Sequence, residues 1–289
     1  MSDSVVSIVV SALTLGALYC LLASGLSLIW STLRVFNFAH GGLLILSAYL
    51  IWSFAVPVGM PLILAVACAI PIMAVAGLLL QLIAVRPLIG RPRGDLLVMV
   101  STLAVAGIIE GAIQLTWGPL SKRLPPLVDG VVKVGDTAIG ATEIASLVVA
   151  LALVGGLIVL MQYTEWGVRI RAVEQNREMA RLMGIKPTRV YTHVLCIAAV
   201  LACAAAVVYG NISTIAPAKG YEPLLTSFVV LVFGGAASLW GVAAGAFAIG
   251  LLESASTFWL GVEWSPIIVF SILVAVMLIR PGGLVGGRA

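Results

Sequence analysis

Apolar runs of about 20 residues follow one another along most of the chain, and this pattern constrains the fold more than any other feature. A helix of ~20 apolar residues is long enough to cross the hydrocarbon core of a bilayer. Inside that core the backbone must bond to itself, which favours helices. The composition agrees, since 62% of the residues are hydrophobic and only 10% are charged. We therefore expect an all-α polytopic membrane protein, with residues 1–289 forming a single domain.

The runs predict about eight membrane segments. They lie at Val5–Trp30, Gly41–Val56, Pro61–Val85, Leu96–Trp117, Ile144–Tyr163, Tyr191–Ile215, Leu224–Leu252 and Pro266–Ile279. The first run is too long for the core of a signal peptide and has no Lys or Arg before it, so we expect it to remain as a span.

The basic residues between the runs predict the orientation. They are Arg86, Arg91 and Arg93, then Arg169 to Arg189, then Arg280 and Arg288 after the last run. The positive-inside rule places all three regions in the cytoplasm. The charges of the 118–143 loop nearly cancel, so this loop is expected on the extracytoplasmic side. The N-terminus is then outside and the C-terminus is cytoplasmic.

The Gly-rich segment Leu224–Leu252 must enter and return on the same side, because the loops that flank it both fall outside in this count. Gly234 and Gly235 lie near its middle, and small residues permit a break and close helix packing at membrane depth. We expect two half-helices that form a re-entrant hairpin. A single long tilted helix with an outward C-terminus is the alternative, which the terminal arginines disfavour.

A second interruption contains Asn37, His40 and Gly41. Broken segments in both halves of a transporter-like chain point to an inner site lined by exposed backbone. The alternative is an ordinary turn at the membrane surface with a hydrogen-bonded His, and spacing alone favours that alternative. Glu110 lies within the fourth run, where a carboxyl is costly and is a candidate functional group, unless it is hydrogen-bonded within the bundle or lies nearer the interface.

The segment Thr164–Pro187 has a density of charge that hydrocarbon cannot hold, so it lies in water. The absence of Gly and Pro predicts a helix over Ala172–Met183, which Gly184 ends in a left-handed conformation before Pro187. Glu174 with Arg177, and Glu178 with Arg181, are three residues apart and can pair. A small or apolar stripe runs along Ala172, Asn176, Met179, Ala180 and Met183. These features support a surface loop and a docking element for a cytoplasmic partner equally.

Five motifs, collinear from about Leu15 to Gly287, resemble those of a known family. They are Leu33–Gly41 (LRVFNFAHG), Arg86–Leu88 (RPL) with Trp117–Pro119 (WGP), the Gly167–Gly184 loop, Phe233–Gly241 (FGGAASLWG) with Gly250–Glu253 (GLLE), and Arg280–Leu284 (RPGGL). The chain resembles the permease family of branched-chain amino acid ABC importers, in particular its LivH-type subunit.

The resemblance implies a non-catalytic subunit of the bacterial inner membrane. Its expected partners are a second, LivM-like permease, two ABC ATPases that bind ATP and Mg, a periplasmic solute-binding protein and membrane lipid. This chain would bind no cofactor and no metal. Residues 164–190 would form the cytoplasmic coupling loop, in which Glu174, Arg177, Glu178 and Arg181 set the register and Met179, Ala180 and Met183 supply apolar contact. The path would be shaped by Asn37, His40, Gly41, Glu110, Gly234 and Gly235, although the glycines could equally serve packing.

Other functions stay open at this point. Relatives in the family also carry other amino acids, amides or urea. Gly42 stands where relatives often have an acidic residue, and Glu110 where many have a neutral polar one, which puts the substrate in doubt. An enzyme is disfavoured, since the sequence has no nucleotide-binding Gly-x-x-x-x-Gly-Lys-[Ser/Thr] and no hydrolase motif. Nucleic-acid binding is disfavoured because the excess of positive charge lies in the loops. An ion-coupled carrier or channel fits the broken segments as well, but needs no docking element.

Overall fold

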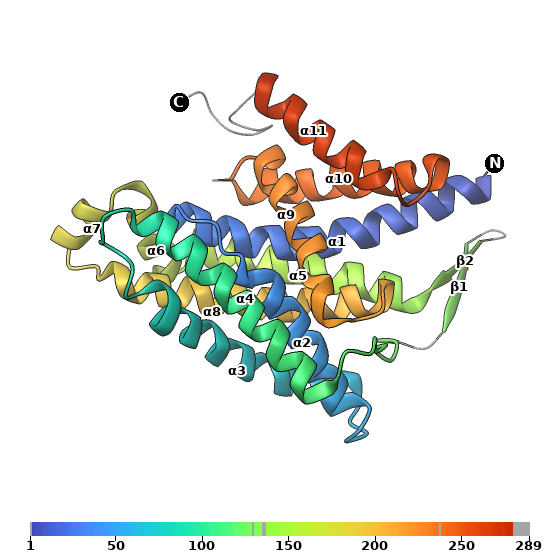
Figure 1. Ribbon diagram of the computed structural model, residues 1–289. Helices are drawn as coiled ribbons and strands as arrows, with labels where there is room; N and C mark the ends of the chain where they lie inside the picture. The colour runs from blue at the N-terminus through green and yellow to red at the C-terminus, as the bar shows by residue number, and fades with distance from the viewer. Residues whose placement is uncertain (1, 129, 135–136, 237, 280–289) are drawn as a thin grey trace.

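Helices account for the apolar runs, because a helix bonds its own backbone groups where no water is available. The computed structural model describes residues 2–128, 130–134, 137–236 and 238–279. Its helices are α1 Ser2–Leu33, α2 Ala39–Ala55, α3 Leu62–Leu80 with the π-helix η1 Gln81–Val85, α4 Gly94–Trp117, α5 Ala141–Tyr163, α6 Glu165–Gln175, α7 Arg177–Leu182, α8 Pro187–Ile212, the 3₁₀ turn η2 Pro217–Gly220, α9 Tyr221–Gly234, α10 Leu239–Leu260 and α11 Ser265–Ile279 (Figure 1).

Each predicted run therefore corresponds to helix, with ends that differ by a few residues in every run except Leu224–Leu252, which is divided between α9 and α10. Among the described residues, six helices are long and apolar enough to cross a membrane: α1, α3 with η1, α4, α5, α8 and α10. α2 and α11 are apolar but shorter, with 17 and 15 residues. Arg280 and Arg288, which supported a cytoplasmic C-terminus, and the motif Arg280–Leu284 lie outside the described residues.

The expected all-α architecture is correct except in the 118–143 loop. Two short strands, β1 Val131–Val134 and β2 Thr137–Gly140, pair antiparallel there, from Val131 opposite Gly140 to Val134 opposite Thr137. Three of the four residues of β1 are valine, which favours a strand. The same loop is tied to the bundle where Lys122 and Ile215 exchange two backbone hydrogen bonds of 2.9 Å.

α1 and α8 form the centre of the bundle. They are the most buried of the six long helices, and α8 packs against α1, α2, α3 and α5. Its buried face is rich in alanine, including Ala198, Ala202 and Ala206. Small side chains let helix backbones approach closely, which matters in a membrane because lipid tails are as apolar as Leu. α3, α4 and α5 lie further out and expose more of their surface.

The bundle has two distinct ends. Figure 1 shows the N-terminus of α1 near the β-hairpin, and α6 and α7 at the opposite end. We call these the β-hairpin end and the α6–α7 end.

The segment 224–252 is broken where the sequence predicted, but its second part is not a half-helix. α9 has 14 residues and ends at Gly234, and Gly235 has a φ of +95°. α10 then runs for 22 residues to Leu260, well beyond Leu252, and is long enough to span. The turn between them lies toward the α6–α7 end, because Ser27 near the end of α1 donates a 2.8 Å hydrogen bond to the Ala236 carbonyl. The chain thus doubles back, with a short α9 and a full-length α10.

Two contacts between glycine backbones hold the interrupted segments in place. A Cβ atom at Gly41 would meet the carbonyl of Gly220, and one at Gly220 would meet the carbonyl of Gly41. At the other end of α9, a Cβ at Gly234 would meet the backbone of Gly241 in the first turn of α10. Only glycine permits approach at this range, so these positions are set by packing.

Replacement of Gly41 is expected to destabilise the protein. Gly41→Val must push α2 away from η2, at a cost of about 1–3 kcal/mol. The apparent Tm of the detergent-solubilised protein should fall. Gly155→Val is the matched control, because a Cβ at Gly155 has no atom within 4 Å. An equal fall in both variants would contradict the packing role.

The direction of α10 can be tested by labelling. In a background without Cys68 and Cys196, single cysteines replace Trp240 and Val262, which are 64% and 72% exposed. Because Trp240 lies at the start of α10 and Val262 lies two residues beyond its end, a membrane-impermeant maleimide should label them from opposite sides of the membrane. Met183→Cys marks the α6–α7 end, and the maleimide should label it from the same side of the membrane as Trp240→Cys. Labelling of both ends of α10 from one side would disprove a spanning α10.

Candidate functional site

The charged segment folds as two short helices, which corrects the single helix expected over Ala172–Met183. Asn176 between α6 and α7 is extended, with φ −155° and ψ 109°. Its side-chain oxygen accepts hydrogen bonds from the backbone N–H groups of Glu178 and Met179, both 3.0 Å long. Asn176 is therefore the N-cap of α7 and not part of an apolar stripe. The end of α7 is as predicted, because Gly184 has a φ of +80° and Ile185 donates to the Ala180 carbonyl.

The break at Asn176 also separates the expected ion pairs. Among the described residues, one ion pair lies within 4 Å, between Arg169 and Glu165. The predicted pairs Glu174–Arg177 and Glu178–Arg181 are therefore not formed in this part of the chain. Arg177 turns toward the bundle, where its guanidinium donates a 2.9 Å hydrogen bond to the Thr32 carbonyl and lies 5.6 Å from the Tyr191 ring. Carbonyls in the last turn of a helix lack helical partners, so Arg177 satisfies one of them and ties α7 to α1 and α8.

Glu174 is also directed toward the bundle. Burial raises the pKa of its carboxyl, and the guanidinium groups of Arg34 and Arg171 counteract part of this rise. Arg171 and Glu174 share a cleft of about 230 Å³ with Ser31 of α1 and with Ser238 and Trp240 at the start of α10. These two charged side chains of α6 thus meet the turn between α9 and α10.

The two faces of α6 and α7 differ sharply. Ile170, Val173 and Ala180 are buried against the bundle, and Trp166 stacks on His193 of α8 with ring centroids 4.0 Å apart. On the outer face, the side chains of Met179, Leu182 and Met183 are 60%, 81% and 82% exposed. We call these three residues the apolar knob. Leu182 lay outside the stripe drawn from the sequence, because the break at Asn176 changes the helical phase.

Asn37 and His40 do not form a turn at the surface. Their exposed fractions are 2% and 0%. The Asn37 side-chain oxygen accepts a 3.1 Å hydrogen bond from the Ala39 N–H group, but neither ring nitrogen of His40 meets a hydrogen-bond partner at bonding geometry among the described residues. The His40 ring packs beside Gly25 of α1. Both residues therefore lie inside the helix bundle and not on its exposed surface.

Glu110 lies close to this junction. It accepts a 3.3 Å hydrogen bond from Gln114 one turn later on α4. It also lines a small crevice with Gly42 of α2 and with Gly220 and Tyr221 at the start of α9. The structure therefore gathers Asn37, His40, Gly41 and Glu110 around the start of α2. Gly234 and Gly235 are elsewhere, at the far end of α9, which is about 20 Å away at 1.5 Å per residue.

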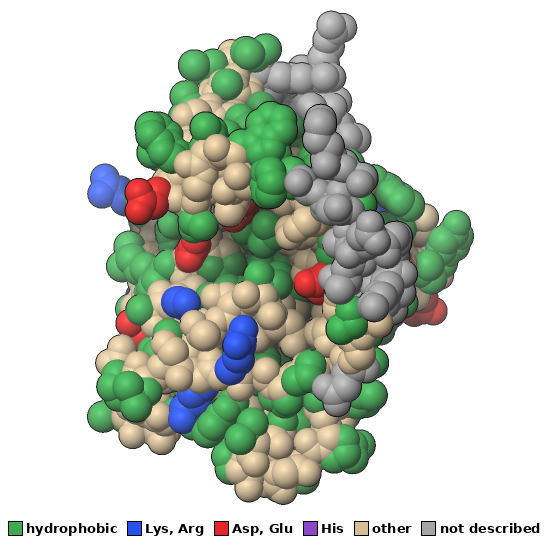
Figure 2. Space-filling model, turned by 90° about the vertical axis from the view of Figure 1, so that its right-hand side faces the viewer, with side chains coloured by type: hydrophobic (Ala, Val, Ile, Leu, Met, Phe, Trp, Pro, Cys, Tyr) green, Lys and Arg blue, Asp and Glu red, His purple; other side chains and the backbone are tan. Residues whose placement is uncertain are grey.

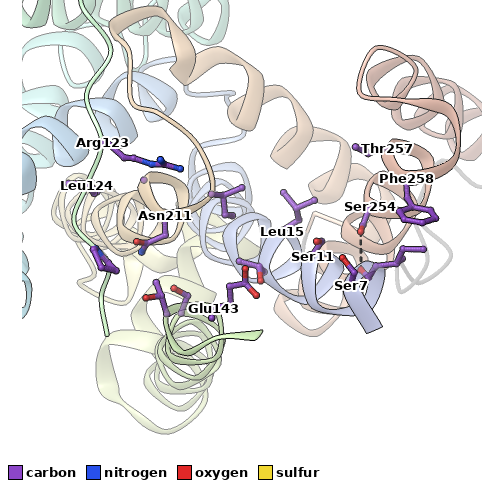
Figure 3. A pocket seen from close by; sticks show the side chains of 18 residues that line it. Ser7, Ser11, Leu15, Arg123, Leu124, Glu143, Asn211, Ser254, Thr257 and Phe258 are labelled. Carbon is purple, nitrogen blue, oxygen red and sulfur yellow. Dashed lines mark hydrogen bonds between the residues drawn. The ribbon is translucent and has the colours of Figure 1, made fainter. Parts of the chain in front are cut away.

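A cavity of about 760 Å³ opens at the β-hairpin end, and sequence reasoning missed it. Figure 2 shows this end of the molecule, with acidic and basic side chains around a hollow. In Figure 3, Arg123 enters from the loop, Glu143 from the start of α5, Asn211 from the end of α8 and Ser254 from α10. Its lining comes from five separate segments, including the first turns of α1, so no local motif indicates it.

The whole chain is similar to a family of transport permeases. The family model described as "Branched-chain amino acid transport system / permease component" matches residues 8–278. The permease protein BraD of Pseudomonas aeruginosa is 26% identical over 96% of this chain and 94% of its own length. The permease protein LivH of Escherichia coli (strain K12) is 27% identical with the same coverage. The probable branched-chain amino acid transport permease protein LivH of Methanocaldococcus jannaschii is 30% identical over 93% of this chain and 89% of its own length. Since the family model covers nearly the full length, this chain belongs to the branched-chain amino acid transport system permease family.

Proposed function

We propose that this chain is the transmembrane permease subunit of an ATP-driven importer in the bacterial inner membrane, and that it carries amino acids, with leucine, isoleucine and valine as the first candidates. The observation that carries this proposal is the apolar knob on α7. Met179, Leu182 and Met183 are exposed on a short charged helix, while the opposite face of the same segment is buried. Such a face fits a hydrophobic groove on a soluble partner.

The partner in this proposal is an ABC ATPase, which would bind ATP and Mg itself. Two ATPases would draw together on ATP binding and move α6 and α7 as a rigid body. The side chains of Glu178 and Arg181 are exposed beside the knob and would set the register. Arg177, Glu174 and Ala180 face the bundle, so in this proposal they pass the movement on to α1, α8 and the turn between α9 and α10.

Substrate identity rests on the relatives. BraD and LivH are named as branched-chain amino acid permeases, and identities of 26–30% leave room for a different amino acid, an amide or urea. A periplasmic solute-binding protein would select the substrate and deliver it. The buried residues Asn37, His40 and Gly41 and the half-exposed Glu110, which all lie near the start of α2, would line the path within this subunit. Gly234 and Gly235, expected to shape the path, are instead proposed to shape the α9–α10 turn beside α6.

A second permease would pack on the face of α4. α4 is the least buried of the six long helices, and a Cβ at Gly107 or Gly111 would meet nothing within 4 Å. The half-exposed Glu110 and the exposed Gln114 lie on this helix. Lipid cannot solvate a carboxyl, whereas a partner helix can approach across glycines and offer a polar group. By contrast with α4, the exposed helices α3 and α11 contain no charged residue.

The docking proposal predicts that a substitution that introduces a charge into the apolar knob releases the ATPase. Leu182→Glu should weaken binding of the ATPase by more than about tenfold, since an unpaired charge buried at an interface costs about 2 kcal/mol or more. Import should fall with it. The readout is the amount of ATPase that co-purifies with the tagged chain from its native membrane. Thr188→Glu, at an exposed position of the same end, is the control. Retention of the ATPase by Leu182→Glu would refute docking at α7.

The α4 proposal predicts loss of the second permease. Gly111→Leu should reduce co-purification of the second permease while the ATPase is retained, because a large side chain separates the helix backbones. Gly155→Leu on α5 is matched to it, since that glycine is equally free of neighbours. If Gly155→Leu sheds the second permease and Gly111→Leu does not, the interface lies on α5.

A further inference from the structure

The cavity at the β-hairpin end has a charged rim and a hydroxyl-rich interior. Arg123 and Glu143 are exposed at its opening, whereas Thr14, Ser146 and Ser254 are 6%, 1% and 6% exposed within it. Figure 3 shows Arg123 and Glu143 as coming from different walls, with Asn211 between them. One cation and one anion thus flank a polar space large enough for a small molecule, since ligand sites commonly measure about 300–1,000 Å³.

The two charged residues are held by local anchors. Arg123 lies between Lys122, which exchanges backbone hydrogen bonds with Ile215, and Leu124, which packs directly on Gly210 of α8. The Lys122 ammonium also lies 3.9 Å from the centroid of the Trp52 ring. On the other side, the hydroxyl of Thr142 beside Glu143 donates a 2.8 Å hydrogen bond to the Val128 carbonyl. A loop fixed at these points presents its charges in a defined place.

One polar group in the interior is available to a ligand. The Ser254 hydroxyl donates to the Ile8 carbonyl and the Thr14 hydroxyl to the Val10 carbonyl, each at 2.9 Å. The Ser146 hydroxyl lines the same cavity and has no hydrogen-bond partner among the described residues. A buried hydroxyl without a partner is unfavourable, and a bound polar group would satisfy it.

The walls of the cavity are apolar between these groups. Leu15, Leu124, Ile212 and Phe258 contribute to the lining. A guanidinium is suited to a carboxylate, a carboxylate to an ammonium, and aliphatic walls to an aliphatic side chain. We propose that this cavity binds an aliphatic α-amino acid as a zwitterion, with its carboxylate at Arg123 and its ammonium at Glu143, before the amino acid enters the bundle. This inference rests on the proposed import function and adds a binding site on this chain.

The test is equilibrium binding of radiolabelled L-leucine to the complete assembly in nanodiscs, without the solute-binding protein. Arg123→Gln and Glu143→Gln should each weaken binding about tenfold or more, and Ser146→Ala by a few-fold, as expected for lost hydrogen bonds to charged and neutral groups. Lys219→Gln and Glu263→Gln remove charges outside the cavity and should bind leucine as the unmodified protein does.

Competition by two analogues of leucine distinguishes a specific loss of recognition from misfolding of a variant. Isopentylamine has no carboxylate and 4-methylpentanoate has no ammonium, so each should compete with leucine poorly. Because Arg123→Gln lacks the carboxylate partner, it should no longer distinguish leucine from isopentylamine. An assembly with a misfolded variant would lose the binding of both ligands and also its ATP hydrolysis, whereas a specific loss of leucine binding leaves ATP hydrolysis by the ATPase subunits intact.

The remaining outcomes overturn the proposal in distinguishable ways. If the assembly imports leucine with its binding protein but binds none without it, or if Arg123→Gln and Glu143→Gln bind normally, the cavity site is disproved and the import function stands. If an ethanolamine lipid displaces leucine and its binding depends on Arg123 and Glu143, the cavity is a lipid headgroup site. If the assembly with a binding protein imports no amino acid, the proposed function itself fails.

Discussion

The close contact between the backbones of Gly41 and Gly220 decides where the two interrupted parts of the chain meet. Each glycine lies where the other's carbonyl leaves no room for a side chain. This contact brings the start of α2 against η2, where Glu110 of α4, about 70 residues further along the chain, lines a crevice with Gly42 and Gly220. In hydrocarbon, where apolar side chains gain little by leaving lipid, such close backbone approach supplies much of the packing energy.

Much of this architecture could be predicted from hydropathy alone, because the length of an apolar run is set by membrane thickness. The break near Gly234 was also predictable, since only small residues tolerate it. The burial of Asn37 and His40 was not predictable, because a polar residue between two apolar runs looks the same in the sequence whether it lies on the surface of the protein or in its interior. The burial of the His40 ring depends on its contact with Gly25, which lies in a different helix, α1.

The charged segment shows a different limit of sequence reasoning. Glu174, Arg177, Glu178 and Arg181 have spacing that suits one continuous helix, yet Asn176 breaks it by capping α7 with its own side chain. Helix propensity favours continuation only slightly, whereas Arg177 gains a carbonyl of α1 and the ring of Tyr191 when the helix breaks. Tertiary contacts therefore outweigh local spacing. Asn, a preferred N-cap residue, was the available signal.

α1 and α8 physically connect the two candidate sites at opposite ends of the molecule. α1 contributes Thr14 to the cavity and Thr32 to the contact with Arg177, about 27 Å apart at 1.5 Å per residue. α8 likewise contributes Asn211 to the cavity and Tyr191 to Arg177, about 30 Å apart. Both are continuous helices at the centre of the bundle, so we expect a displacement of α7 to shift each of them along its length. Movement driven at the apolar knob would thus reshape the cavity walls directly, without a chain of intervening side chains.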